Sequence, residues 1–409
     1  MKVFLNRIRG LRQPVRSLLY LYWIGIFIFD IMASFLQIAV FKMFSDVSVN
    51  IAGAIFSYTG IMLGFCIFGY IASRFQLNAK QGFYYSFIFC AVGILILAVT
   101  KSAPTAYLAL FINGAGNGFF WLTLHTYELA ETKDTERDFY SSLLTSGRSV
   151  ISIFSPLFAT TLIWLSLYVF NFSSFALLFT VTPLFYLLGL FCFKGIRTYV
   201  PERIELEDVK HFLFDKKNIL AQLYIGSNGA SHILAAAITP VAIFYILGTE
   251  LRFGIYSTLV SILTILIVLV LGHYRNDHNR LLLYGVSSFG ISLILVLLGY
   301  HLTFYVLVIV TIINTILTPI MQVSDHVISL QTMESIGRVG RDFYATMILR
   351  DFSLWFWRMI IAFVLLFLST KIQDTATVIS LGLYMLAACV LLSFVGAFLL
   401  VRKMRSASN

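Results

Sequence analysis

The pentapeptide Glu136-Arg137-Asp138-Phe139-Tyr140 returns almost unchanged as Gly340-Arg341-Asp342-Phe343-Tyr344. Each copy lies in a polar gap between two long apolar runs, follows an acidic residue and precedes an arginine inside the next apolar run. These flanking residues are Glu128 or Glu131 and Arg148 around the first copy, and Glu334 and Arg350 around the second. Two loosely similar halves made of apolar segments are typical of secondary transporters, which are built from internal repeats.

The composition excludes a soluble globular protein. Hydrophobic residues make up 59% of the chain and charged residues only 12%, and the mean hydropathy is +0.89. At about 20 residues per crossing, the chain has room for roughly a dozen membrane helices. Continuous apolar runs such as 261–272 exclude an outer-membrane barrel, whose strands alternate in hydrophobicity. The formal charge of +10 lies in alternate loops rather than on one face, so the sequence predicts no nucleic-acid partner.

Hydrophobic patterning predicts twelve transmembrane helices and no soluble domain. In the first half the helices are expected near 17–42, 50–73, 81–100, 104–131, 139–166 and 174–195. In the second half they are expected near 218–248, 253–272, 281–299, 303–331, 343–369 and 375–401. The predicted domains are an N-terminal half over 1–195, a cytoplasmic linker over 196–217 and a C-terminal half over 218–409.

The distribution of basic residues predicts the topology. With the N-terminus placed in the cytoplasm, only four of the 29 Lys and Arg residues fall in loops on the other side: Lys42, Lys101, Arg252 and Lys371. Because Lys and Arg concentrate in cytoplasmic loops, both termini and both pentapeptide loops are predicted to be cytoplasmic. We therefore expect a multi-pass protein of the plasma membrane, with a bacterial inner membrane favoured.

Several loop motifs resemble those of the major facilitator superfamily. The loops after helices 2 and 8 share its glycine followed by basic residues, and the loop after helix 10 shares its acidic residue followed by an arginine. The residues are Gly69, Arg74 and Lys80, Gly272, Arg275 and Arg280, and Glu334 and Arg341. The resemblance covers essentially the whole chain. The arginine in helix 4 that is usual in drug/proton antiporters has no counterpart in Leu110–Gly118.

The resemblance implies an all-α integral membrane protein with twelve transmembrane helices in two pseudosymmetric six-helix bundles. It implies that the halves rock about a midplane site, with helix 1 lining the cavity. The expected partners are a small-molecule substrate, a coupling ion (H⁺ being favoured) and membrane lipids. The protein is expected to act as a monomer, without a cofactor and without enzymatic activity.

Polar residues at membrane depth are the candidate substrate-binding and coupling residues. A charge near the bilayer centre costs at least about 2.5–3.5 kcal/mol, so each such residue needs a partner or a wet cavity. The candidates are Asp30, Gln37, Asn117, Arg148, Asn228, His232, Arg350, Asp351 and Arg358. The three arginines can bind an anionic group bidentately or neutralise the aspartates, and the sequence leaves both roles open. Asp30 and His232 are too few ligands to predict a metal site.

A second set of polar residues lies at the cytoplasmic ends of helices 4, 5, 10 and 11. Ion pairs there could close the cytoplasmic side in one state and break in the other. The candidate gate residues are His125, Glu128, Glu131, Arg137, Asp325, His326, Glu334 and Arg341.

Together these features predict a secondary active transporter that moves a small polar, anionic or amphiphilic solute by alternating access. Proton coupling is favoured, and export is one of the two directions left open. The alternatives are a non-transporting receptor or scaffold, a lipid flippase or scramblase, and a transporter of divalent metals or metal chelates.

Overall fold

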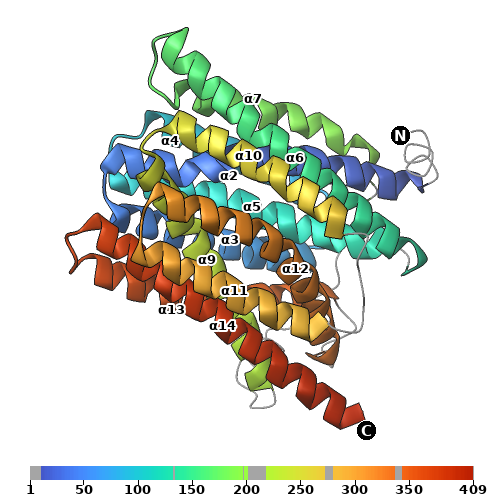
Figure 1. The fold of residues 1–409 in the computed structure, drawn as a ribbon. Coiled ribbons are helices and arrows are strands. Elements are labelled where there is room, and N and C mark those ends of the chain that lie inside the picture. Colours follow the sequence, from blue (N-terminus) through green and yellow to red (C-terminus); the bar gives the residue numbers. More distant parts are fainter. Residues whose placement is uncertain are drawn as a thin grey trace. The chain divides into compact units, whose positions relative to one another are not determined.

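The structure is all-α. The computed structural model describes residues 11–131, 134–196, 198–200, 218–271, 280–336 and 343–408. Within these residues there are twelve α-helices, one 3₁₀-helix and no strand (Figure 1). The helices are α2 (Gln13–Phe44), α3 (Val47–Arg74), α4 (Gln81–Val99), α5 (Ala103–Glu131), α6 (Asp134–Tyr168), α7 (Ala176–Gly189), α9 (Ile219–Leu247), α10 (Glu250–Leu271), α11 (Arg280–Tyr300), α12 (Phe304–Ile336), α13 (Phe343–Ser369) and α14 (Thr375–Ser408), with η1 (Leu190–Gly195) after α7.

Ten of these helices are long and apolar enough to cross a membrane. The shorter apolar helix α7 and the more polar α5 complete the twelve predicted helices. Helix α5 carries Asn113 and Asn117 among three glycines, so it is less suited to face lipid than its neighbours. The all-helical membrane class predicted from the sequence is therefore confirmed.

Several helices extend beyond their predicted ends. Helix α6 begins at Asp134 rather than near residue 139, α12 runs on to Ile336, and α14 runs on to Ser408. Polar residues such as Glu136 and Gln331 form helix well, so a helix continues after its apolar run ends. The predicted helix 174–195 divides instead into α7 and the 3₁₀-helix η1. Apolarity marks the membrane-embedded part of a helix and not its full length.

The chain divides into two compact units. Unit 1 comprises Met1–Leu36 and Thr59–Ile204, and unit 2 comprises Gln37–Tyr58 and Glu205–Asn409. The C-terminal end of α2 and the N-terminal part of α3 thus pack with helices of the second half of the sequence. Most of the predicted linker 196–217 lies outside the described residues, and the division into two six-helix bundles stays a prediction.

Unit 1 is held together by aromatic rings and by close helix packing. Phe120 of α5 contacts the rings of Phe29, Phe83 and Phe87 from α2 and α4, with centroids 4.8, 5.6 and 6.2 Å away. Helices α3 and α5 approach so closely that a methyl group on Gly64 would overlap the backbone of α5. Small residues at such crossings let membrane helices pack backbone to backbone.

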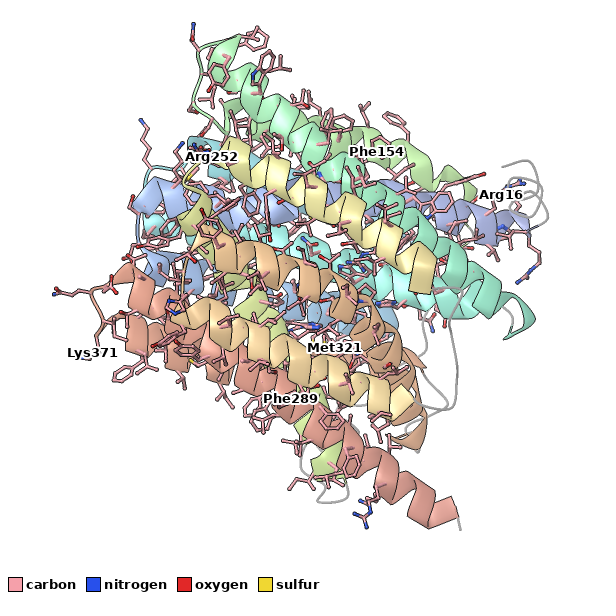
Figure 2. All side chains as sticks on the ribbon, viewed as in Figure 1. Arg16, Phe154, Arg252, Phe289, Met321 and Lys371 are labelled. Carbon is pink, nitrogen blue, oxygen red and sulfur yellow. The ribbon has the colours of Figure 1, made fainter. Side chains whose placement is uncertain are left out.

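Unit 2 is centred on α9, which packs against α13 and α14, while α11 packs against α12 and α14. The core of this unit contains Tyr224 of α9, Tyr284 of α11 and Ile328 of α12. Large apolar side chains on the outside of the helices, such as Phe154 of unit 1 and Phe289 of unit 2, are exposed, as lipid-facing residues should be (Figure 2).

The loop before α14 shows how a helix begins at the water-exposed end of this protein. Asp374 accepts hydrogen bonds from the backbone N–H and the hydroxyl of Thr377, the former at 2.9 Å. These bonds satisfy groups at the helix N-terminus that otherwise lack a partner. Because they favour the carboxylate, they hold the pKa of Asp374 below its usual value.

Candidate functional site

The predicted binding residues fall into two groups, one in each unit. Asp30, Asn117 and Arg148 belong to unit 1. Gln37, Asn228, His232, Arg350, Asp351 and Arg358 belong to unit 2. Each group is described within its own unit.

In unit 1 the side chains of Asp30 and Arg148 interact electrostatically across α2 and α6. Arg148 also donates a hydrogen bond to the hydroxyl of Tyr22, which precedes Asp30 by about two turns of α2. A carboxylate and a phenol of α2 thus interact with a guanidinium of α6, and Arg148 itself is exposed. Asn117 is less available, because its amide nitrogen donates to the Asn113 carbonyl at 3.0 Å within α5.

A second polar cluster in unit 1 involves two predicted gate residues. Glu128 and His125 of α5 are joined by a hydrogen bond with 2.9 Å between Oε2 and Nδ1. The other Glu128 oxygen accepts a hydrogen bond from Tyr140 of α6 at 3.5 Å, and His125 stacks on Trp121. Glu128 therefore links α5 to α6 near the first pentapeptide.

In unit 2 the charged side chains of α13 carry buried polar atoms that have no hydrogen-bond partner. These atoms are Nε of Arg350, Nε of Arg358 and Oδ2 of Asp351. Arg358 is 7% exposed and Asp351 6% exposed. The neighbouring Gln222 of α9 accepts a hydrogen bond from Ser353 and leaves its own amide nitrogen unpaired. This region therefore holds three buried donors without acceptors and one acceptor without a donor.

Arg358 also contacts α3. Its guanidinium carbon lies 4.7 Å from the centre of the Tyr58 ring, the geometry of a cation–π interaction. The Tyr58 hydroxyl donates a hydrogen bond to the backbone carbonyl of His232 at 3.4 Å. Tyr58 is thus a residue that sequence reasoning missed and that joins α3 to both α13 and α9.

Asp325, predicted as a gate residue, lies among side chains of α9 and α11. Its carboxylate accepts hydrogen bonds from Tyr224 at 2.5 Å, from Asn228 at 3.1 and 3.2 Å, and from Tyr284 at 3.3 Å. Arg350 interacts electrostatically with Asp325 and with Tyr224. The structure thus brings Asp325 together with two of the predicted binding residues, Asn228 and Arg350.

The two units repeat one arrangement. Tyr22 interacts with Arg148 in unit 1, and Tyr224 interacts with Arg350 in unit 2. The same number of residues separates Tyr22 from Tyr224 and Arg148 from Arg350. In each unit the tyrosine also interacts with a carboxylate, Glu128 or Asp325. The missed tyrosines could have been found by aligning the two halves on the arginines.

Other gate residues cannot be placed. Arg341 lies outside the described residues, and the side chains of Glu131, Arg137, His326 and Glu334 are likewise not described although their backbone is helical. The predicted closure by pairs across the two pentapeptide loops therefore stays a prediction.

Unit 2 contains a further set of contacts that the sequence did not reveal. Lys42 at the end of α2 forms an ion pair with Glu250 at the start of α10, and Glu250 is 7% exposed. Asn50 of α3 donates to the Ala237 carbonyl of α9 at 2.7 Å. Gln37 is buried, and its side-chain oxygen lacks a partner. These contacts join the first two helices to the second half of the sequence.

Replacing Lys42 or Glu250 should destabilise these contacts. Because Glu250 is buried and Lys42 half-exposed, we expect Lys42→Glu to cost about 1–3 kcal/mol of stability, between the values for exposed and buried pairs. The double variant Lys42→Glu/Glu250→Lys should regain most of the lost melting temperature. Lys101→Glu, at an exposed lysine, is the matched control. Single-variant losses that simply add in the double variant would contradict the pairing.

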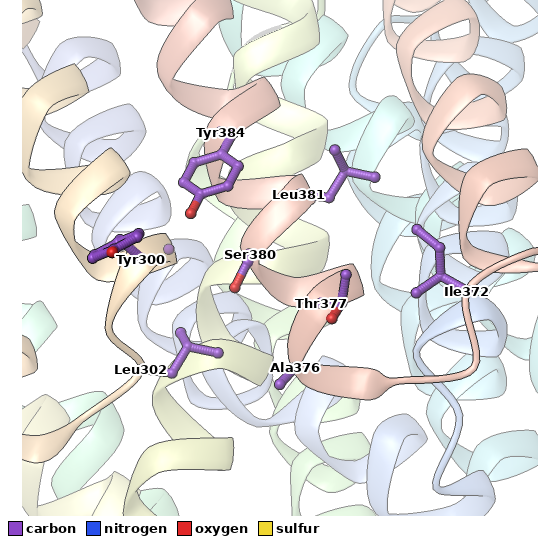
Figure 3. A pocket seen from close by; sticks show the side chains of 9 residues that line it. Tyr300, Leu302, Ile372, Ala376, Thr377, Ser380, Leu381 and Tyr384 are labelled. Atoms are coloured by element: carbon purple, nitrogen blue, oxygen red, sulfur yellow. The ribbon is translucent and has the colours of Figure 1, made fainter.

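A cavity of about 480 Å³ opens between the end of α11 and the start of α14. Figure 3 shows Tyr300, Ser380 and Tyr384 among its lining residues. None of the predicted binding residues lines it, so it is not assigned as the substrate site. Among the described residues there is also no group of three or more His, Cys, Asp or Glu side chains that could hold a metal ion.

Comparisons with known proteins agree with this architecture. The family profile of the Major Facilitator Superfamily matches residues 18–339. A peptide transporter, POT, in complex with sulfate has a TM-score of 0.64 at 14% identity, over 96% of this chain and 95% of that chain. The nucleoside transporter NupG has a TM-score of 0.65 at 14% identity, over 95% and 99%. The human organic anion transporter MFSD10 (TETRAN) has a TM-score of 0.60 at 12% identity, over 94% and 99%.

Comparison with curated protein sequences gave no match. The profile match covers well over half of the chain, and the fold similarity extends over nearly all of it. The chain therefore belongs to the major facilitator superfamily and is a multi-pass membrane transporter of the secondary type, not an enzyme.

Proposed function

We propose that this transporter moves a small polar solute that carries an anionic group, in exchange for or together with protons. One observation carries the proposal. Around α13 the Nε atoms of Arg350 and Arg358 and the amide nitrogen of Gln222 are buried donors without acceptors. A buried donor left unpaired costs about 1–3 kcal/mol, and more when the donor is charged. A ligand that brings carboxylate or phosphate oxygens would satisfy all three.

The charges of the two units suit this function. Arg350 interacts electrostatically with Asp351 and Asp325, and Asp325 also accepts hydrogen bonds from three neutral side chains. Guanidinium remains charged at every physiological pH, so Arg350 and Arg358 are permanent cations. The group that binds and releases the coupled proton would then be a carboxylate. We propose Asp30, which interacts electrostatically with Arg148 in unit 1, as this coupling residue. The same fold accommodates an organic anion transporter, so it is compatible with anionic substrates.

The test begins with purified protein and a thermal-shift screen. The ligands are grouped as organic acids, phosphorylated metabolites, siderophore-like chelates, neutral nucleosides and lipophilic cations. A ligand present at 100 times its Kd raises the stability of the folded state by about 2.7 kcal/mol, which is readily measured. We expect the stabilising ligands to come from the anionic groups.

Transport itself is then measured in proteoliposomes with an imposed pH gradient. Uptake or release of the stabilising anion should follow the gradient and collapse with a protonophore. Gradient-driven flux of cations alone would contradict the anionic substrate. Binding without any flux would favour a receptor or scaffold, and movement of lipid analogues between leaflets would favour a flippase.

Location and topology are part of the proposal. The distribution of Lys and Arg supports a plasma-membrane location with both termini in the cytoplasm. Reporter fusions after Asn409 that are active only in the cytoplasm would support this orientation, and reporters active only outside would overturn it.

A further inference from the structure

The carboxylate of Asp325 is held by three neutral side chains of unit 2. Tyr224 and Asn228 reach it from α9, and Tyr284 reaches it from α11. Tyr284 is in turn tied to Ser393 of α14 by a hydrogen bond of 2.8 Å. All three side chains donate to this carboxylate, so Asp325 is the shared acceptor of the cluster.

The Asp325 carboxylate decides how the amide of Asn228 is oriented. The amide nitrogen lies 3.1 and 3.2 Å from the two carboxylate oxygens, so the nitrogen faces Asp325 and one N–H is shared between the two oxygens. The reverse orientation would bring two acceptors, the amide oxygen and a carboxylate oxygen, against each other. The amide oxygen must therefore point away from Asp325, and Asn228 is only half-buried. Asn228 thus offers an accessible hydrogen-bond acceptor whose direction is fixed.

The acceptor lies in the neighbourhood of the arginines. Helix α9 packs against α13, and a methyl group added to Gly229 would come within 2.8 Å of the Leu354 carbonyl. Asn228 precedes this close approach on α9, and Arg350 lies one turn before it on α13. Arg350 also interacts electrostatically with Asp325 itself. A fixed acceptor and a cation with an unpaired donor therefore belong to one region of unit 2.

We propose that Asp325 is a positioning residue that fixes Asn228 as an acceptor, and that the substrate is an anion bearing a hydroxyl or amino group. The proposal rests on the anionic substrate proposed above and adds its second chemical feature. A plain anion would satisfy the arginines but would leave the Asn228 oxygen without a donor. Sites built to bond a substrate hydroxyl reject analogues that lack it.

Two matched ligand pairs test the proposal: glycerol 3-phosphate against n-propyl phosphate, and lactate against propionate. The two members of a pair carry the same anionic group, so the ratio of their Kd values measures what the hydroxyl contributes to binding. We expect wild-type protein to bind the hydroxylated member of at least one pair about 3- to 10-fold more tightly, as one net hydrogen bond provides. Asn228→Leu should bring this ratio to about one.

Two further variants separate positioning from stability. Asp325→Asn frees the Asn228 amide to rotate and should reduce the ratio, whereas Tyr284→Phe removes a different donor to Asp325 and should preserve it. If Asp325→Asn does not fold, the test rests on the ratio of Kd values measured for Asn228→Leu and Tyr284→Phe. A ratio that survives in Asn228→Leu, or equal binding of both members by wild type, would overturn the inference and leave the anionic substrate standing. If wild type binds none of the four anions, the inference is overturned, whereas the proposed function is decided separately by the thermal-shift screen and the flux measurement.

Discussion

Lysine in place of Arg350 or Arg358 is expected to weaken the binding of anionic ligands by about 10- to 100-fold. Lysine keeps the charge but lacks the planar fork and the Nε donor, which is the atom left unpaired in both arginines. Hydrogen bonds to charged groups contribute about 1.5–3 kcal/mol, and each 1.4 kcal/mol corresponds to a tenfold change in Kd. Titration of the purified variants with the stabilising anion measures the effect.

The melting temperatures of these variants tell a binding residue from a structural one. Both should melt close to wild type, because the positive charge beside Asp351 is retained. Arg252→Lys, at an exposed residue outside the group, is the matched control for the Arg-to-Lys change. Normal binding combined with much earlier melting would make the arginines structural counter-ions, and the anionic substrate would have to be abandoned.

Asparagine in place of Asp30 is expected to abolish the response of transport to a pH gradient. Asn matches Asp in size but cannot bind or release a proton, and Arg148 would lose its carboxylate neighbour in unit 1. Gradient-driven flux in proteoliposomes should fall to the passive leak, while exchange of labelled for unlabelled substrate continues. Substrate exchange needs no net proton movement, so it separates coupling from binding.

Asp46→Asn is a suitable control for this change. Asp46 lies just before α3, where its carboxylate accepts the Ser48 N–H at 2.7 Å at an exposed position. This variant should keep the pH response. Full coupling in Asp30→Asn would show that the Asp30 carboxylate is structural, and loss of both coupling and exchange would place it in substrate binding.

The fold could be predicted from the sequence because each membrane helix is encoded by a long apolar run. Apolar runs of about twenty residues leave few alternatives to membrane helices, and short polar gaps fix their order. The helix ends were less predictable. Asp134 begins α6 although no apolar residue marks that start, because water satisfies charged side chains while the backbone remains helical.

The candidate site was only partly predictable, for a different physical reason. A charged residue within or beside an apolar run is conspicuous in the sequence, and Asp30, Arg148 and Arg350 were chosen as candidates in this way. Its partner is set by the rotation of each helix, and helices such as α3 and α10 are apolar on every side, so their inner face cannot be read from the sequence. The contact of Tyr58 with Arg358 and the ion pair of Lys42 with Glu250 therefore became visible only in the structure.

Helices α2 and α3 each belong to both compact units, and this has a thermodynamic consequence. Each is one continuous helix, so the contacts that hold its two ends belong to different units. No proline interrupts residues 15–74, so neither helix has a proline kink there. The ends in unit 2 are held by side-chain contacts such as those made by Lys42, Asn50 and Tyr58, together with buried apolar residues of the same segments. A single substitution among these contacts therefore changes how firmly the ends of α2 and α3 are held in unit 2, by about tenfold in the equilibrium constant for every 1.4 kcal/mol.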